Sequence, residues 1–328
     1  MSDVTKTNDH ASNCKAFAVS LGYYEDPYIK AFAKYPERKP PEISLGTKAF
    51  VNSCRLLKRC ELIGTYVRAM VVRLVVSEFI SIFKRKCNIV SLGAGFDTLF
   101  WNLDLKPDKY IEVDLKEVVM RKSFIVQRNP LLRQYLSKDA KITPTGITSE
   151  SFHLLNVDIS GDPEVALNHI VELTGLDKNL PVLFLSECVL VYLESEKSQK
   201  LIDTIPNLFK DAFFLLYEQV NIDDRFGQIM MDNIRSTWCA NIGDTACTSL
   251  QTQEERFKKK GQWGHVKARL TSHLSQLLPG YNKAYQIERL DEEELLQQLL
   301  THYCFLFATN QTQFENNPDL NYIKDFFL

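Results

Sequence analysis

Asn88-Ile89-Val90-Ser91-Leu92-Gly93-Ala94-Gly95-Phe96-Asp97-Thr98 is the stretch that decides the fold. A short apolar run ends in two glycines one residue apart, and apolar residues at helical spacing follow from Leu99. This order predicts a strand, a tight turn, and a helix whose first backbone N–H groups point at a bound ligand. Glycine suits such a turn because any Cβ would keep a ligand away from the backbone.

A second strand is expected at 110–114, and it ends in the carboxylate of Asp114. An acidic residue about 20 positions after the glycines is typical of a side chain that accepts hydrogen bonds from an adenosine ribose. The third glycine of a dinucleotide-binding fingerprint is absent, because Thr98 stands in its place. The pattern therefore favours a nucleoside cofactor without a pyrophosphate, such as S-adenosyl-L-methionine, over the alternative of a nicotinamide-dependent oxidoreductase.

Strand and helix patterns alternate along the rest of the chain, which is typical of an α/β protein with a doubly wound, mostly parallel sheet. The further strands expected are 152–158, 181–187, 212–218, 285–289 and 303–309. The helices expected are 115–128, 163–174, 201–209, 226–238 and 292–300.

The chain is predicted to form one domain after a short arm. Residues 1–13 are polar and are expected to be disordered, and 14–328 are expected to form a single domain. Within it, 14–86 would make a helical cap with two or three helices after position 44, and 87–328 would make the Rossmann-like core. Two loops are expected, at 37–43 because of its prolines and at 137–151 because of its polar composition.

Polar features follow four of the predicted strands. Gly93, Asp114, Asp158 and Glu187 each stand where a strand ends. Parallel strands bring their carboxyl ends to one edge of the sheet, where α/β proteins bind ligands. A single carboxylate there could merely cap a helix, but four such features on successive strands indicate an active site.

Composition excludes several classes of function. The net charge of −2 gives no basic field for nucleic-acid binding. The eight cysteines and six histidines show no zinc-type or redox-type spacing, so no metal is expected. The N-terminus lacks the apolar core of a signal peptide, and charged residues interrupt every long apolar run. We therefore expect a cytoplasmic protein, most simply a monomer, with no membrane or nucleic-acid partner.

Several strings resemble the leucine carboxyl methyltransferase family. They are Leu92-Gly93-Ala94-Gly95-Phe96-Asp97-Thr98, Glu112-Val113-Asp114 and Glu187-Cys188-Val189-Leu190-Val191-Tyr192. The similarity runs from about Cys14 to Thr309. It implies a class I S-adenosylmethionine-dependent fold and an enzyme that esterifies the C-terminal leucine carboxylate of the protein phosphatase 2A catalytic subunit, and so regulates assembly of the phosphatase holoenzyme.

The resemblance also implies a set of cofactor-binding residues, by position in this chain. Arg68 would pair with the methionine carboxylate, with Arg73 as the alternative, while Asp114 would bind the ribose and Asp158 the adenine amino group. The full set implied is Lys15, Arg68, Gly93, Asp114, Asp158, Ile159 and Glu187.

Carboxyl methylation needs positioning residues rather than an acid–base pair. A free carboxylate titrates near pH 4, so it is already an anion at neutral pH. Alignment of the reacting atoms can contribute roughly 7–11 kcal/mol. Tyr192, Gln219 and Arg225 are the candidates for positioning the acceptor.

Two alternatives stay open within the resemblance. One is a relative that methylates a modified tRNA base, and the other is a non-catalytic scaffold that binds phosphatase tails. The last residues, Asp325-Phe326-Phe327-Leu328, also look like the tail that the family methylates. This likeness is either a coincidence or the mark of a tail that enters the pocket of its own or a neighbouring molecule.

Overall fold

The computed structural model describes residues 4–33, 48–238, 247–287, 293–311, 314 and 318–327. Side chains are described for these residues except at 4–6, 48–60, 236–238 and 319. The loop predicted at 37–43 lies outside the described residues.

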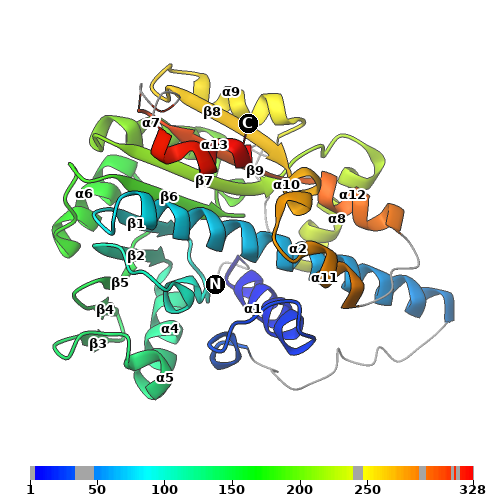
Figure 1. The fold of residues 1–328 in the computed structure, drawn as a ribbon, viewed down its shortest axis with the longest axis horizontal. Coiled ribbons are helices and arrows are strands. Elements are labelled where there is room, and N and C mark those ends of the chain that lie inside the picture. Colours follow the sequence, from blue (N-terminus) through cyan, green and yellow to red (C-terminus); the bar gives the residue numbers. More distant parts are fainter. Residues whose placement is uncertain are drawn as a thin grey trace.

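A nine-stranded sheet forms the centre of the described structure, with the order β3-β4-β5-β2-β1-β6-β7-β9-β8 (Figure 1). The strands are β1 (Asn88–Leu92), β2 (Lys109–Asp114), β3 (Lys141–Thr143), β4 (Gly146–Thr148), β5 (Phe152–Asn156), β6 (Val182–Glu187), β7 (Ala212–Gln219), β8 (His265–Leu270) and β9 (Tyr303–Thr309). The five strands from β5 to β7 are parallel, and β9 pairs antiparallel with both β7 and β8. The predicted doubly wound, mostly parallel α/β architecture is confirmed.

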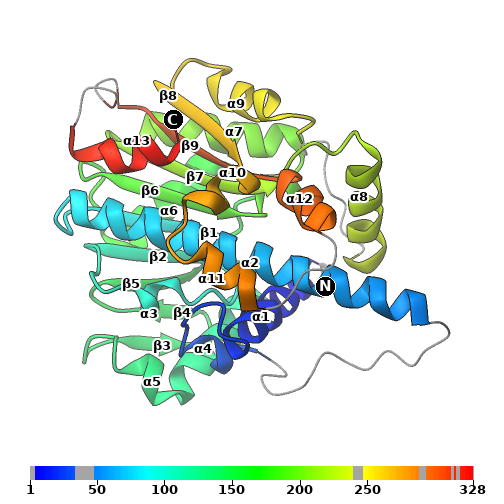
Figure 2. The ribbon, with the colours of Figure 1, turned by 45° about the vertical axis from the view of Figure 1, so that its right-hand side comes forward.

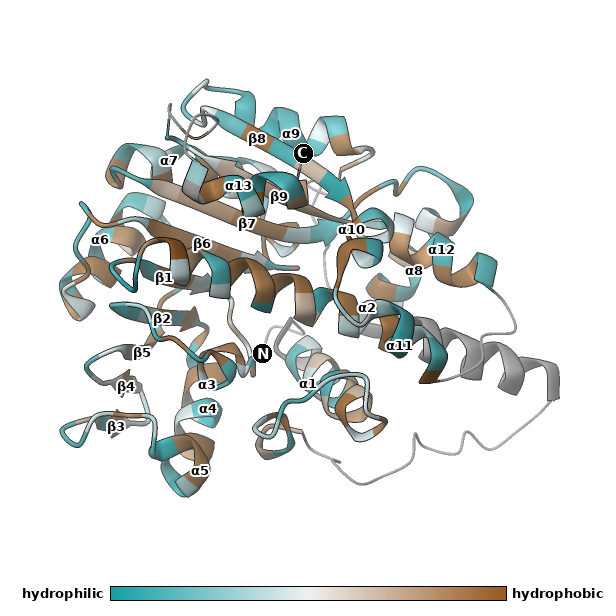
Figure 3. Ribbon diagram, viewed as in Figure 1, coloured by the Kyte–Doolittle hydropathy of each residue, from teal (hydrophilic) through white to brown (hydrophobic). Residues whose placement is uncertain are grey.

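Helices cover both faces of the sheet, which is why the central strands are almost wholly apolar. One face packs against α2 (Lys48–Ile82), α4 (Lys116–Arg128) and α13 (Asn321–Phe327). The other face packs against α6 (Pro163–Thr174), α7 (Ser195–Leu208) and α9 (Leu250–Lys258). Figure 3 shows the resulting contrast, with β6 and β7 coloured hydrophobic and the outer helix α9 largely hydrophilic.

The remaining elements are short, apart from α1 and α8. They are α1 (Val4–Ser20), α3 (Leu99–Asn102), α5 (Pro130–Arg133), α8 (Arg225–Trp238), α10 (Thr271–Leu277), α11 (Tyr281–Ile287), α12 (Glu293–Thr301), and the 3-10 turns η1 (Ile29–Ala31), η2 (Leu190–Tyr192) and η4 (Pro318–Leu320).

The N-terminal arm is helical rather than disordered, so that prediction was wrong for residues 4–13. Helix α1 lies alongside α2 (Figures 1 and 2). Its polar residues find ionic partners, since Arg121 Nη2 lies 2.7 Å from Asp9 Oδ1 and Lys15 Nζ lies 2.5 Å from Asp97 Oδ1. Ion pairs to distant elements order this segment, and its polar composition alone gave no sign of them.

The predicted two or three helices after position 44 are one helix of 35 residues, α2. No proline interrupts it, and its one glycine, Gly64, would accommodate a Cβ at 3.6 Å from Leu299. Val67, Val71, Val75 and Phe79 are fully buried along one stripe and pack on the sheet. A continuous apolar face of this kind keeps the helix intact.

Two other predictions fail in the structure. The segment 137–151 contains the hairpin of β3 and β4 instead of being a loose loop, because Ile147 is buried against the sheet. The strand expected at 285–289 is helix α11 as far as Ile287, and 288–289 lie outside the described residues. The strand that pairs with β9 at the edge of the sheet is β8, which was not predicted. Only Val266 and Ala268 of this strand are buried, so its alternation is too weak to recognise.

Helix α13 packs on the body of the protein. Phe326 and Phe327 are buried in the core, and Arg269 Nε donates to the carbonyl oxygen of Phe327 at 2.9 Å. Both aromatic side chains would have to leave the core before this segment could enter a pocket. No helix in the described ranges has both the length and the apolar character that crossing a bilayer requires.

Candidate active site

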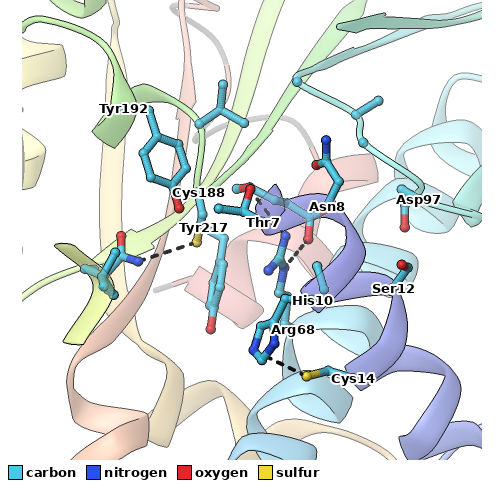
Figure 4. Close-up of a pocket in the computed structure, with 18 of the residues that line it drawn as sticks. Thr7, Asn8, His10, Ser12, Cys14, Arg68, Asp97, Cys188, Tyr192 and Tyr217 are labelled. Carbon is cyan, nitrogen blue, oxygen red and sulfur yellow. Dashed lines mark hydrogen bonds and ion pairs between the residues drawn. The ribbon is translucent and has the colours of Figure 1, made fainter. Parts of the chain in front are cut away.

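A cavity of about 1270 Å³ opens at the carboxyl ends of the parallel strands. The chain runs from β1 to β2 and β5 and then crosses back to β6, so the strand order reverses between β1 and β6. This reversal is where α/β sheets bind ligands. Helices α1, α2, α8 and α12 supply the other walls, and Figure 4 shows side chains from several of these elements around the common space.

The turn after β1 holds two glycines in the left-handed region. Gly93 has a φ of +59° and Gly95 a φ of +55°. A Cβ on Gly93 would stand 2.7 Å from Val189 Cγ2, and one on Gly95 would stand 2.6 Å from Asn8 Oδ1. Glycine is therefore needed at both positions, because the backbone is left-handed and because a Cβ would contact a neighbouring side chain.

Asp114 at the end of β2 is held by the backbone around it. Its Oδ2 accepts from the N–H of Gly95 at 2.6 Å, and its Oδ1 accepts from the N–H of Leu115 at 2.7 Å. Burial raises the pKa of this carboxyl, while the two N–H donors oppose that rise. Each oxygen keeps a further lone pair, so the carboxylate can bind a pair of adjacent hydroxyls on the cavity side.

Asp158 and Ile159 line the cavity just beyond β5. Asp158 Oδ1 accepts from the N–H of Ser160 at 2.8 Å, which fixes the turn. A carboxylate acceptor beside an apolar side chain fits the edge and the face of an adenine ring.

Arg68 reaches the cavity from α2 and pairs with Glu187 at the end of β6. Its Nε lies 2.6 Å from Glu187 Oε2, and its guanidinium carbon lies 5.2 Å from the centre of the Tyr217 ring. Arg73 instead donates to the carbonyl oxygen of Glu25 at 3.1–3.2 Å and is not part of the cavity wall. Of the two arginines left open by the sequence, Arg68 is the one placed at the site.

Lys15 joins α1 to the glycine turn. Burial would raise the pKa of the Asp97 carboxyl, but the ammonium groups of Lys15 and Lys122 outweigh it and lower the pKa to about 2. Lys122 lies beneath the turn, where its Nζ donates to the carbonyl oxygen of Asp97 at 2.8 Å and stands 2.6 Å from Glu112 Oε2. Both members of the Lys122–Glu112 pair are fully buried.

The opposite half of the cavity is largely apolar and aromatic. Tyr192, Tyr217 and Tyr303 line it, and the last two rings stack with centres 5.2 Å apart. Gln219 also lines this half, and its amide nitrogen lies 3.9 Å from Cys188 Sγ. Apolar residues of α8 and α12 complete the wall, namely Phe226, Ile229, Met230, Ile234, Leu295, Leu299 and Leu300.

Arg225 does not belong to this group. It is exposed at the start of α8 and does not line the cavity, so the sequence prediction that it grips the acceptor lacks support from its position. Phe226, the next residue, turns into the cavity instead.

The sequence analysis missed the contribution of α1 beyond Lys15. Thr7, Asn8, His10 and Cys14 line the cavity, as Figure 4 shows. Thr7, His10 and Cys14 recur at intervals of three and four residues, which is one helix face, and Asn8 lies next to Thr7. That spacing was a usable signal, but the polar composition led to the prediction of disorder.

Among the groups whose pKa shifts are resolved, no side chain that lines the apolar half has the lowered pKa of a general base. Burial raises the pKa of the Cys188 thiol to about 12 and raises the pKa values of Tyr192 and Tyr303. The Cys188 thiol and the phenols of Tyr192 and Tyr303 therefore stay protonated at neutral pH.

Comparison with known proteins gives the family. The model of the family described as leucine carboxyl methyltransferase matches residues 3–206. The chain is 37% identical over 325 residues to leucine carboxyl methyltransferase 1 of Rattus norvegicus, covering 94% of this chain and 90% of the relative. It is 32% identical to the Arabidopsis thaliana homolog of that protein, covering 94% and 89%.

Solved structures share the fold at low identity. A presumed methyltransferase of Thermobifida fusca matches 79% of this chain and 85% of its own with a TM-score of 0.51 and 14% identity. A DUF574 family protein of Streptomyces avermitilis matches 91% and 96% with a TM-score of 0.52 and 10% identity. The fold is that of class I methyltransferases, and the chain is a methyltransferase that belongs to the leucine carboxyl methyltransferase family.

Proposed function

We propose that this protein transfers a methyl group from S-adenosyl-L-methionine to the α-carboxylate of the C-terminal leucine of the protein phosphatase 2A catalytic subunit. Family membership supports carboxyl methylation of leucine. The observation that carries the proposal is one cavity lined both by polar residues at the strand ends and by aromatic and apolar residues, many of them from α8 and α12.

The polar half fits the cofactor. Two left-handed glycines leave room at the turn, and Asp114 presents a fixed carboxylate to a ribose diol. Asp158 and Ile159 would hold the adenine, and Arg68 would bind the methionine carboxylate while Glu187 orients its guanidinium. When bound, S-adenosyl-L-methionine supplies an electrophilic methyl group on a sulfonium.

Lys15 would support cofactor binding by holding helix α1 in place, in addition to any direct contact with the cofactor. Its ammonium is paired with Asp97, so it holds α1 against the glycine turn and helps to close the cavity. Exclusion of water strengthens the interactions within a site and removes the hydration shell of an attacking anion.

The apolar half fits a leucine side chain at the end of a peptide. Tyr192 and the apolar residues of α8 and α12 would surround the isobutyl group. Gln219 can donate a hydrogen bond to the acceptor carboxylate, and a neutral donor positions that oxygen without quenching its nucleophilicity. These side chains therefore orient an acceptor that needs no general base at neutral pH.

The five cysteines whose side chains the structure describes agree with a reducing compartment. Cys14, Cys87, Cys188, Cys247 and Cys304 are free thiols, as is usual in the cytoplasm. We place the reaction there, with the enzyme acting as a monomer on the phosphatase subunit.

The test is methyl transfer from labelled S-adenosyl-L-methionine to the purified phosphatase 2A catalytic subunit, beside a subunit that lacks its terminal leucine. We expect label on the intact subunit alone, and much less of it with the Asp114→Asn variant. Label on neither subunit by an enzyme that still binds the cofactor would refute the acceptor and leave the cofactor site standing. Failure to bind the cofactor would refute the site itself.

A further inference from the structure

Three side chains with metal-binding atoms come together on the cavity wall between α1 and α2. His10 and Cys14 stand one turn apart on α1, and Glu61 faces them from α2. One nitrogen, one sulfur and one oxygen from the three lie within 4.8 Å of one another, and Cys14 Sγ is 3.6 Å from His10 Nε2. Figure 4 shows the contact between His10 and Cys14 beside Arg68.

The spacing of these atoms suits a shared ion. Zinc binds sulfur at about 2.3 Å and imidazole nitrogen at about 2.0–2.1 Å, so a tetrahedral ion separates the two by roughly 3.5 Å. A weak hydrogen bond between thiol and imidazole has a similar length, and it alone would explain His10 and Cys14. The Glu61 carboxylate adds an oxygen within 4.8 Å of both atoms, which is the third donor that a metal site needs.

The charges of the set suit a divalent cation. A thiolate and a carboxylate carry two negative charges together, and the imidazole binds as a neutral ligand. A nitrogen, sulfur and oxygen donor set selects zinc-class ions over magnesium or calcium, which prefer oxygen alone. All three residues also line the cavity, so a fourth coordination position faces open space.

We propose that His10, Cys14 and Glu61 form a binding site for one zinc ion, with the fourth position open to the cavity. The ion joins α1 to α2. Helix α1 carries Asn8 and Lys15 to the glycine turn, so the ion stabilises the side of the cavity that α1 closes. No metal was expected from the sequence, because its cysteines and histidines show no zinc-type or redox-type spacing. The three donors proposed here come from two helices, so spacing along the chain does not reveal them.

The test uses the full chain, reduced with a phosphine and freed of metal with a chelator. Cobalt(II) is titrated as the spectroscopic probe, and zinc is then added to displace it. We expect one equivalent of cobalt with tetrahedral d–d bands and a thiolate charge-transfer band, both abolished by zinc. Cys14→Ser should remove the charge-transfer band. His10→Ala and Glu61→Gln should each weaken binding by at least the roughly 10–100-fold that loss of a metal-site residue costs.

His169→Ala is the matched control, since His169 is an exposed histidine on α6, and it should bind cobalt as the wild type does. His10 is exposed, so the His10→Ala variant is expected to fold. If Cys14→Ser fails to fold, the His10→Ala variant still decides the test. Hydrogen exchange should show zinc protecting amides in 7–20 of the wild type and not of His10→Ala. An absent charge-transfer band in the wild type, or unchanged cobalt affinity in His10→Ala, would overturn the proposal and leave a thiol–imidazole hydrogen bond.

Discussion

Replacement of Lys122 by Met tests how the glycine turn is supported. Lys122 and Glu112 form an ion pair of 2.6 Å with no exposed surface on either side chain. Removing one partner of a buried pair costs about 3–5 kcal/mol, because the other charge loses its compensation. At pH 6 we expect the loss of stability in Lys122→Met to be about 3 kcal/mol, the lower end of this range. At that pH the Glu112 carboxyl can take up a proton instead of remaining charged.

The pH dependence of stability follows from Glu112. Burial raises the pKa of this carboxyl from 4.5 to about 7, although Lys122 opposes the rise. A raised pKa stabilises the folded protein fully below pH 4.5, and that contribution is lost as the pH rises through 7. Without Lys122 the pKa rises further, so the loss continues above pH 7 at up to about 1.4 kcal/mol per pH unit. Lys122→Met should therefore be more destabilised at pH 8 than at pH 6.

Urea unfolding followed by circular dichroism at both pH values is the assay. Lys116→Met is the matched control, because Lys116 is exposed on the same helix, and it should change stability by less than about 0.5 kcal/mol. The double variant Glu112→Leu/Lys122→Met should recover part of the loss, because an apolar pair replaces the ion pair. Cofactor affinity should be lower than that of the wild type in both Lys122→Met and the double variant, since each lacks the hydrogen bond from Lys122 to the Asp97 carbonyl oxygen.

A double variant that is no more stable than Lys122→Met would refute this account of the pair. So would a Lys122→Met protein that is as stable as the Lys116→Met control at pH 8.

Three further substitutions test the site. Gly93→Ala places an alanine in the left-handed region, which costs about 1–2 kcal/mol of backbone strain, and brings its Cβ to 2.7 Å from Val189. Isothermal titration calorimetry should show at least tenfold weaker cofactor binding. Unchanged affinity would contradict the role of the turn. Asp114→Asn loses a charged acceptor for the ribose, worth about 1.5–3 kcal/mol, so cofactor Kd should rise roughly 10–100-fold, and a rise below twofold would remove Asp114 from the site. Arg68→Lys loses the guanidinium geometry that pairs with Glu187, so kcat/KM for the cofactor should fall at least tenfold; wild-type kinetics would show that Arg68 does not touch the cofactor.

The central sheet was predictable because its strands obey simple rules. The apolar run at 88–92 ends in glycines, and the strands that end at Asp114 and Glu187 are buried on both faces. Because the strands are parallel, their carboxyl ends lie at the same edge of the sheet, and this does not depend on the conformation of the loops. For that reason Gly93, Asp114, Asp158 and Glu187 were predicted to lie at one edge of the sheet, and all four line the cavity. Lys15, Arg68 and Ile159, which also line it, came from the family resemblance. That these residues bind the cofactor stays a prediction.

The elements outside the sheet depend on contacts that no local pattern reveals. Helix α1 is ordered by pairs such as Asp9 with Arg121, which are 112 positions apart. The orientation of helix α8 places Phe226 toward the cavity and Arg225 toward solvent. A sequence prediction that misplaces the inward face of this helix by one residue exchanges the two. The acceptor half of the site, which α8 and α12 complete, was accordingly the part that the sequence predicted least well.

The most direct measurement is tandem mass spectrometry of the phosphatase 2A catalytic subunit after reaction with the enzyme and S-adenosyl-L-methionine. The account predicts one added methyl on the terminal leucine of the C-terminal peptide, removed by mild base as an ester should be. A base-stable methyl group, or one on any other residue, would contradict carboxyl methylation of that leucine.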